Sequence, residues 1–395
     1  MKFKGYIRED GLVGVRNLYL VLGVCDAVEG IVRGIAREFD DVITVTSAHG
    51  CPAAGNEQVI NNMAGLANNP NVVGVLIIGI GCEGVKPEMI IDLIDTKKPV
   101  AIMEVVNEKG TRNTIERGIG IIKDMQRSFG QPQRELVDIA KLTVGVKCGG
   151  SDTTSGIAAN SSVGAAVDKL VDWGATVLFT EPIECIGGEA ELMARAANQD
   201  VANQIKETIS LEEKRWTVPG TEVEFMCIGN ITGGLSTIEE KSLGAIHKSG
   251  SRPIQGVLEY SDRILERPKK SGVYLQDGTM LFSHCLTHLA AAGCQLLIFT
   301  TGIGASVSSQ LLPTIRVCGN PDSYRKMIDD MDINAGTIIE GTESINTVGE
   351  KIVDKLIKVA GGEKTSIEDV GYSGFAIYKK DPRVEYFIQR YMKQN

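Results

Sequence analysis

Short apolar runs alternate with amphipathic segments along the first third of the chain. The apolar runs have the length and branched side chains of buried strands: Leu18–Val24, Val42–Ser47, Val72–Ile78 and Pro99–Val105. The segments that follow them have helical character: Asp26–Phe39, Asn56–Leu66, Pro87–Ile94 and Thr111–Ser128. This alternation predicts a parallel sheet with helices on both faces.

A polar stretch from Arg127 to Arg134 marks a boundary, and a second alternating unit begins at Leu142–Val146. Its further predicted strands are Thr176–Phe179, Val223–Ile228, Gln295–Thr300 and Thr314–Val317. Its predicted helices are Ala158–Trp173, Glu189–Thr208 and Ile345–Val359, and a small helix or interface arm is expected between Val370 and Asn395. We therefore expect two α/β domains, residues 1–133 and 134–395, with mainly parallel sheets and glycine-rich loops at the strand ends.

Composition narrows the class of protein. The 395 residues are 43% hydrophobic and 23% charged, as in globular proteins, and a net charge of −9 argues against a nucleic-acid partner. Nine cysteines at scattered spacings do not resemble a secreted disulfide framework. The chain has no apolar stretch of about 18 residues and no signal-like start, so we expect a cytoplasmic protein with no membrane contact. The 45 glycines cluster after strand-like runs, which is typical of an enzyme built on strand-end loops.

Three cysteines stand where an apolar run ends in a glycine-rich turn: Cys51, Cys82 and Cys148. Ligand sites of open α/β sheets lie at such turns, and three thiolates would suit a soft metal or a cluster. Buried free cysteines are the alternative interpretation. His49 lies two residues before Cys51 and would be a further ligand or an acid–base group if Cys51 binds metal.

The loop Lys147-Cys-Gly-Gly-Ser-Asp-Thr-Thr-Ser-Gly156 is the densest polar loop of the chain. Its backbone amides and hydroxyls favour an anion, with Ser151, Asp152 and the following Asn160 as candidate substrate-binding residues. The alternative is a well-capped start of a helix. The loop lacks the Gly-Lys-Ser/Thr ending of a Walker motif.

Two carboxylates, Glu181 and Glu184, follow another apolar run and would ligate a metal or serve as acid and base. They would equally suit the start of a helix. Lys241 follows a glycine turn and would neutralise a substrate carboxylate or transfer a proton, unless it is a solvated surface lysine. Arg8 and Arg16 precede the first strand, where they would hold an anionic substrate or form surface salt bridges.

A dinucleotide site is one interpretation of Gly79-Ile-Gly-Cys-Glu-Gly84, which fits G-x-G-x-x-G after a strand. A cysteine inside the turn and Pro87 shortly after it argue against NAD, as does the position after the third strand. His284 and His288 are four residues apart, as a metal pair on a helix requires, but such pairs are more often structural.

Taken together, the loops resemble those of the altronate/galactarate dehydratases, a group that includes the large subunit of sulfolactate sulfo-lyase. The resemblance runs through Gly5–Asn17, Gly-Cys51, Gly-Cys82-Glu, Cys148–Asp152, Asn230–Ser242 and Phe299–Gly302. It implies a metal-dependent lyase, usually with iron, that acts on a small hydroxylated carboxylate.

Three departures from the family pattern bear on function. Relatives commonly begin with a small additional domain, whereas this sequence starts directly at Gly5-Tyr6, which implies a separate small subunit. An Arg usually follows Phe299-Thr-Thr-Gly302 in the sugar-acid dehydratases, and Ile303 stands there instead. The histidine near Cys51 is also shifted relative to the expected position.

We therefore expect a hydro-lyase that dehydrates a sugar acid, such as altronate or galactarate, to a 2-keto-3-deoxy acid. A carbon–sulfur lyase that releases sulfite from sulfolactate is one alternative, and a substrate-binding large subunit that is inactive without its small partner is another. The expected cofactor is iron, as Fe²⁺ or an iron–sulfur cluster with Mn²⁺ as the alternative, and the expected assembly is a homo-oligomer. The predicted residues are Cys51, Cys82 and Cys148 for the metal; Glu181, Lys241 and His49 for catalysis; and Arg8, Arg16, Asn17, Ser151, Asp152, Asn160 and Glu184 for the substrate.

Overall fold

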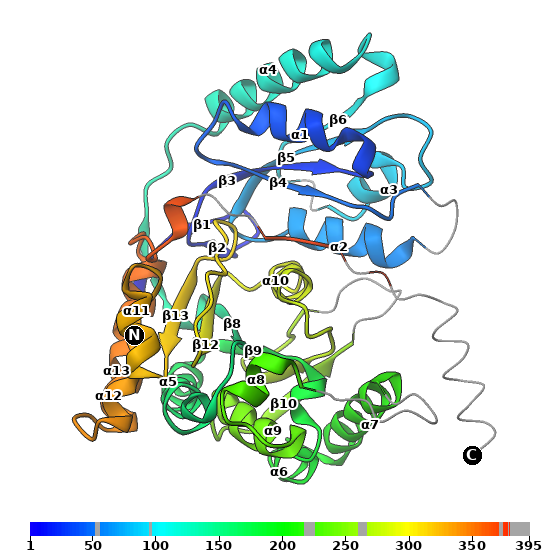
Figure 1. The fold of residues 1–395 in the computed structure, drawn as a ribbon. Coiled ribbons are helices and arrows are strands. Elements are labelled where there is room, and N and C mark those ends of the chain that lie inside the picture. Colours follow the sequence, from blue (N-terminus) through cyan, green and yellow to red (C-terminus); the bar gives the residue numbers. More distant parts are fainter. Residues whose placement is uncertain are drawn as a thin grey trace, which may run out of the picture.

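Two parallel sheets organise the protein in the computed structural model (Figure 1). The structure describes residues 1–51, 56–94, 97–216, 226–259, 267–370, 374–377 and 379. Within these residues, no helix is long and apolar enough to cross a bilayer.

The first sheet has four parallel strands in the order β4-β3-β5-β6. The strands are β3 (Leu18–Gly23), β4 (Val42–Thr46), β5 (Val72–Gly79) and β6 (Val100–Glu104). The central strands β3 and β5 are buried throughout, which explains their nearly continuous apolar sequence. Helices α1 (Glu29–Ala36) and α4 (Thr111–Phe129) cover one face, and α2 (Glu57–Ala67) covers the other. Helix α3 (Pro87–Ile91) follows β5.

The second sheet has seven parallel strands in the order β10-β11-β9-β8-β12-β13-β14. The strands are β8 (Thr143–Cys148), β9 (Thr176–Thr180), β10 (Ile254–Leu258), β11 (Gly272–Gln276), β12 (Leu296–Thr301), β13 (Thr314–Cys318) and β14 (Ile333–Asn334). The helices are α5 (Ser161–Asp172), α6 (Glu189–Ala194), α7 (Gln199–Trp216), α8 (Ile228–Thr232), α9 (Ile238–Ile246), α10 (Phe282–Ala291), α11 (Pro321–Lys326), α12 (Gly336–Ile339) and α13 (Ile345–Ala360).

A third, small sheet and a shared apolar core accompany the two parallel sheets. Strand β1 (Lys2–Ile7) pairs antiparallel with β2 (Val13–Gly14) and with β7 (Glu135–Asp138). Helix α2 packs on α10, and their apolar side chains form one shared core. The first residues of the chain thus share a sheet with residues beyond the predicted boundary at 133.

Each parallel sheet has a pair of neighbouring central strands from which the chain continues toward opposite edges of the sheet. In the first sheet these strands are β3 and β5, and in the second they are β8 and β12. Ligand sites of open α/β sheets form outside the carboxyl ends of the strands at such points. The fold therefore offers two separate positions for chemistry.

The predicted fold class of two α/β domains with mainly parallel sheets is confirmed. Strands β10 and β11 were not predicted, and the expected helix Glu189–Thr208 is two helices, α6 and α7. The prediction of a strand at Val223–Ile228 falls partly outside the described residues, and its last residue begins α8 instead. Most of the arm predicted after Val370 also lies outside the described residues.

Candidate active site at the carboxyl ends of β8 and β9

A buried cluster of charged side chains lies at the end of the second sheet. Cys148 ends β8, whereas Glu181 and Glu184 follow β9 in and beside the short helical turn η5 (Pro182–Cys185). The Cys148 sulfur and one oxygen of each glutamate lie within 4.8 Å of one another. Lys241 of α9 and Lys248 of the turn η6 (His247–Ser249) complete the cluster.

Glu184 is the centre of this cluster. The Cys148 thiol donates to Glu184 Oε2 at 2.7 Å, and Lys248 Nζ donates to the same oxygen at 3.1 Å. Lys241 Nζ lies 3.0 Å from the other oxygen, Oε1. Burial alone would raise the pKa of Glu184, but the ammonium groups of Lys241 and Lys248 outweigh burial and hold the pKa far below its usual value. Glu184 is therefore ionised at neutral pH.

Glu181 has a different environment. Its backbone has φ +74°, a left-handed conformation that a glutamate rarely adopts, and its Oε1 accepts a hydrogen bond from Lys147 Nζ at 2.7 Å. Its Oε2 is buried and has no hydrogen-bond partner among the described residues. Burial and the neighbouring Glu184 raise the pKa of Glu181 to about 7, although Lys147 opposes the shift. The two carboxylates thus have separated pKa values, which suits an acid–base pair.

Lys147 contributes a third buried ammonium group, with 1% of its side chain exposed. Its Nζ lies 4.2 Å from the centre of the Phe282 ring on α10. Burial would lower the pKa of Lys147, but the neighbouring acidic groups, Glu181 foremost, together outweigh burial, so the pKa is raised. With Lys147, Lys241 and Lys248 against two glutamates, the cluster carries more positive than negative side chains and favours an anion.

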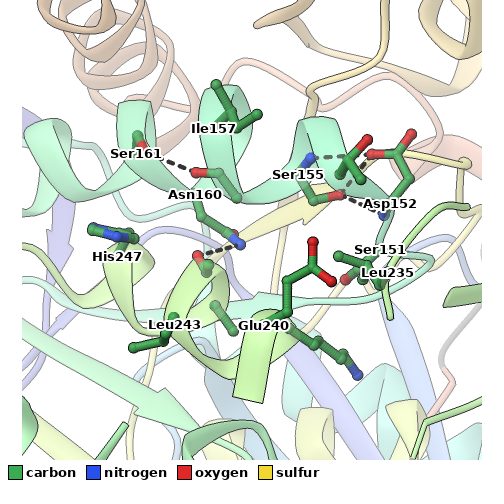
Figure 2. A pocket seen from close by; sticks show the side chains of 15 residues that line it. Ser151, Asp152, Ser155, Ile157, Asn160, Ser161, Leu235, Glu240, Leu243 and His247 are labelled. Carbon is green, nitrogen blue, oxygen red and sulfur yellow. Dashed lines mark hydrogen bonds between the residues drawn. The ribbon is translucent and has the colours of Figure 1, made fainter. Parts of the chain in front are cut away.

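A cavity of about 530 Å³ opens beside the cluster (Figure 2). Its walls come from the loop after β8, the first turns before α5, and α9. The helical turns before α5 pack closely against α9 because each has a glycine at the contact. A Cβ on Gly156 would lie 3.0 Å from the Cα of Gly244. Lys241 lines the cavity and also pairs with Glu184, so it connects the cavity with the buried cluster.

Three further residues predicted to bind substrate also line this cavity, in two different ways. The Ser151 hydroxyl is buried without a described partner, so it is available to a ligand. Asp152 is occupied by the amide and hydroxyl of Ser155, by Thr154 and by Asn320. Asn160 accepts from Thr300 at 2.6 Å and donates to the Gly244 carbonyl at 3.0 Å. Asp152 and Asn160 therefore shape the cavity walls.

The structure places the two predicted substrate-binding arginines elsewhere. Arg8 donates to the Pro70 carbonyl, to Asn17 Oδ1 and to the Arg16 carbonyl at 2.7–2.8 Å. Arg16 pairs with Glu368 at 2.6 Å and also donates to carbonyls in and beyond α13. These contacts, including that of Asn17, tie the first residues to the rest of the molecule and do not bring either guanidinium to the cavity.

The three cysteines predicted to share a metal are divided between the two sheets. Cys148 belongs to the lysine-rich cluster, whereas Cys51 lies with Cys25 and Asp26 at the end of the first sheet. Cys82 is exposed on the loop after β5. Within the described residues, no ligand group contains Cys51, Cys82 and Cys148 together.

His49 lies on the loop after β4, in the first domain. It is close enough to His284 of α10 to contribute, after burial, to the lowered pKa of that histidine. His49 is not among the residues that line the cavity beside Lys241.

Sequence reasoning missed two members of the cluster, Lys147 and Lys248. The sequence holds one indication of a functional role for Lys147, because a charged residue is unusual near the end of a buried strand. Lys248 lies in a short turn after α9 and belongs to no recognisable pattern. Only the fold brings it to 3.3 Å from the Cys148 sulfur.

The chain is similar to known proteins over most of its length. Residues 5–129 match the family model described as the second domain of D-galactarate dehydratase/altronate hydrolase, and residues 139–383 match the C-terminal domain model of D-galactarate/altronate dehydratase. The sequence is 32% identical to (2R)-sulfolactate sulfo-lyase subunit beta of Chromohalobacter salexigens, over 95% of this chain and 96% of that protein. It is 30% identical to altronate dehydratase of Bacillus subtilis, over 95% and 77%, and 33% identical to galactarate dehydratase (L-threo-forming) of Escherichia coli, over 93% and 74%.

Proposed function

Because the chain belongs to the D-galactarate/altronate dehydratase family, we propose that it is a hydro-lyase that removes water from a small polyhydroxy acid. Family membership, predicted from the loop motifs, is confirmed, and the protein is an enzyme of this dehydratase family. The proposed substrates are sugar acids such as altronate or galactarate, and the product is a 2-keto-3-deoxy acid.

One observation carries the proposal: a buried cluster of three lysines and two glutamates borders a cavity through Lys241. Elimination next to a carboxylate requires removal of a weakly acidic proton from the α carbon, which creates negative charge on the carboxylate. Ammonium groups fixed beside that charge stabilise it most strongly where water is excluded. A cluster with excess positive charge supports this chemistry.

We assign roles to three side chains. Lys241 Nζ leaves Glu184 Oε1 for the substrate carboxylate, which then takes the place of one oxygen of Glu184. Glu181, with a pKa of about 7 and an Oε2 that has no described partner, is the base that accepts the α proton. The protonated Glu181 carboxyl then gives this proton to the departing β-hydroxyl, which leaves as water. The Ser151 hydroxyl donates to a substrate hydroxyl, since it has no described partner of its own.

The family resemblance implies iron, so the ligand atoms of this cluster must be available to a metal ion if the iron binds here. The Cys148 thiol, both Glu184 oxygens and Glu181 Oε1 already have partners, and burial with Glu184 raises the pKa of Cys148 to about 12. Three ammonium groups also oppose a dication at this position. The cluster therefore does not fit a metal as arranged, and no step of the proposed mechanism passes through one.

The experiment measures product formation from altronate, galactarate and sulfolactate, with the keto acid and sulfite determined separately. Lys241→Met should reduce kcat/KM by about 100-fold or more, since removing one group that stabilises charge in the transition state costs roughly 10²–10³-fold. Lys169→Met is the matched control, because Lys169 pairs with Glu350 on the surface. Unchanged activity of Lys241→Met would contradict the assignment.

Release of sulfite is the second candidate reaction, and one observation favours it. The turn with Ile303 packs directly on the loop after β8, where the Ile303 amide donates to the Gly150 carbonyl at 2.8 Å. Ile303, which is 42% exposed, stands where an arginine is expected in the sugar-acid dehydratases. Sulfite formed from sulfolactate, with no keto acid formed from the sugar acids, would decide for this reaction.

A separate small subunit also belongs to the proposal, supported by the name "subunit beta" of the sulfo-lyase relative. If the chain alone binds an acid in a calorimeter but does not convert it, the binding-subunit alternative replaces the catalytic one.

A further inference from the structure

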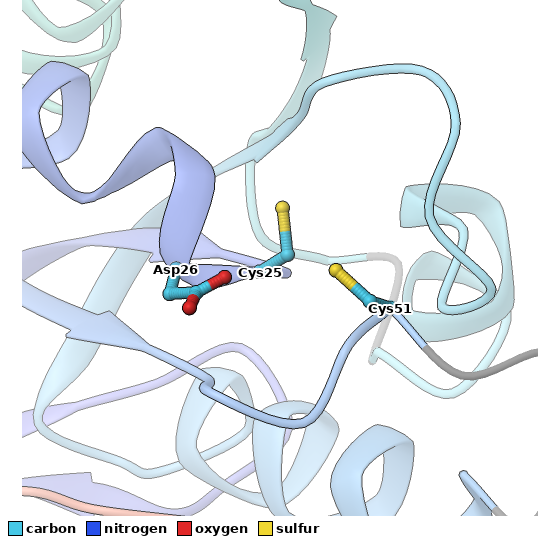
Figure 3. Close-up of side chains that lie close together, drawn as sticks. All are labelled: Cys25, Asp26 and Cys51. Carbon is cyan, nitrogen blue, oxygen red and sulfur yellow. The ribbon is translucent and has the colours of Figure 1, made fainter.

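A second group of ligand-type side chains lies in the first domain, away from the lysine cluster. The Sγ atoms of Cys25 and Cys51 and a carboxylate oxygen of Asp26 all lie within 4.8 Å of one another. Figure 3 shows the Cys51 thiol and the Asp26 carboxylate pointing toward Cys25 from opposite sides. The group stands at the carboxyl ends of β3 and β4, and β3 belongs to the central strand pair of the first sheet.

The backbone brings these residues together for a specific reason. Gly50 lies so close to β3 that a Cβ on it would be 1.7 Å from the Val24 carbonyl oxygen, so only glycine permits this approach. Cys51 follows directly and is therefore carried onto Cys25. The loop after β5 closes the third side, because the Val85 amide donates to the Gly50 carbonyl at 2.9 Å.

The charge of this group is opposite to that of the lysine cluster. Among the residues that the structure describes, no lysine or arginine forms an ion pair with Asp26 or with the neighbouring Glu83. Glu83 is buried; its Oε2 accepts from three backbone amides, whereas Oε1 has no described partner. A buried carboxylate oxygen without a partner is costly, and a nearby cation reduces that cost. The region is therefore suited to a cation.

We propose that Cys25, Asp26 and Cys51 form a binding site for a borderline-soft divalent cation, Zn²⁺ or Fe²⁺. Two thiolates with one carboxylate match these ions, whereas Mg²⁺ and Ca²⁺ prefer oxygen ligands alone. Cys51 and Asp26 are exposed, so the ion has an entry path and an open coordination position. The site does not depend on the proposed elimination, since its ligands belong to the other sheet.

Binding would also fix the loop after β4 against the second domain. This loop carries His49, which, after burial, contributes to the lowered pKa of His284 at the start of α10. Phe282, two residues earlier, lies over Lys147 of the lysine cluster. A metal at Cys51 thus holds in place one of the loops that lie against α10.

The test uses the full chain, stripped of metal with a chelator under reducing conditions and titrated with Co²⁺ and then Zn²⁺. We expect one equivalent of Co²⁺ with thiolate-to-cobalt charge-transfer absorption, which Zn²⁺ displaces. The variants Cys51→Ser and Asp26→Asn should fold, because both residues are exposed. Each should weaken Co²⁺ binding by more than roughly 10–100-fold, which is the effect of losing a residue that only supports a metal ligand. Cys25→Ser should abolish the absorption band.

Two control variants separate this site from other cysteines. Cys294→Ala, in the apolar core shared by the domains, should leave Co²⁺ binding unchanged, and so should Cys148→Ser in the lysine cluster. X-ray absorption of the zinc form should show sulfur ligands at about 2.3 Å. The proposal is overturned if Cys51→Ser binds Co²⁺ as the wild type does, or if Cys148→Ser removes the band instead.

Discussion

Replacing Glu184 with glutamine tests whether charge holds the buried cluster together. Glu184 accepts from the Cys148 thiol and from two lysines, and only 3% of its side chain is exposed. In the variant, Lys241 can turn toward the cavity, but Lys248 is 1% exposed and loses its carboxylate partner at 3.1 Å. An uncompensated buried charge of this kind costs about 3–5 kcal/mol.

This free energy translates into a measurable shift of the thermal transition. For a domain of this size, 1 kcal/mol corresponds to roughly 2–4 °C, so Glu184→Gln should lower the Tm of the second domain by about 6–20 °C. Calorimetry and urea unfolding measure it independently. Glu350→Gln, which removes a surface pair with Lys169, is the matched control and should leave Tm almost unchanged.

A double variant separates the charge effect from loss of packing. Glu184→Gln combined with Lys248→Met removes both charges and replaces the lysine stem with an apolar side chain of similar length. Since apolar replacement of a buried pair is often nearly neutral, the double variant should recover at least half of the lost stability. If its cost equals the sum of the two single variants, or if Glu184→Gln is as stable as the control, the electrostatic account of the cluster is refuted.

Two further predictions concern acid–base chemistry and the N-terminal arginine. Because the folded-state pKa of Glu181 is raised to about 7, its base form is lost as pH falls; kcat/KM should therefore decline below about pH 7, and Glu181→Gln should abolish this limb together with most activity. A pH–rate profile that stays flat from pH 8 to about 5.5 would remove Glu181 as the base. Arg16→Met should lower Tm but leave KM unchanged, because Arg16 binds Glu368 and backbone carbonyls; a raised KM with unchanged Tm would restore its predicted role in substrate binding.

The sequence pattern was sufficient for the fold because the central strands are buried on both faces. β3 and β5 read as continuous apolar runs, and every residue of both strands is buried. β10 and β11 escaped prediction because they are short and contain glycine and glutamine among the apolar residues. The break between α6 and α7 also has no proline or glycine to announce it.

The candidate site was only partly predictable, since sequence position identifies strand ends but not the side chains that meet there. Glu181, Glu184 and Lys241 were each selected from a local pattern, and the structure brings Glu184 within 3.0 Å of Lys241. Lys147 and Lys248 change the chemistry that these three residues support, because the two lysines reverse the net charge of the cluster. Residues separated by up to 100 positions supply those charges, and no local motif records them.

The three cysteines lie at two different sites for the same reason: the sequence identifies strand ends but does not show which of them meet. The rule that ligands gather at the carboxyl ends of parallel strands applies to each sheet separately, and this chain has two such sheets. Cys148 stands beside Lys248, whose ammonium group makes a second cation unfavourable, whereas Cys51 stands beside Cys25 and Asp26. Local charge, more than the presence of a thiol, therefore determines which strand end suits an anion and which suits a metal ion. Under the two proposals, an acid substrate and a metal would occupy different domains, and α10 contacts residues beside both sites: Phe282 lies against Lys147, and His284 lies near His49.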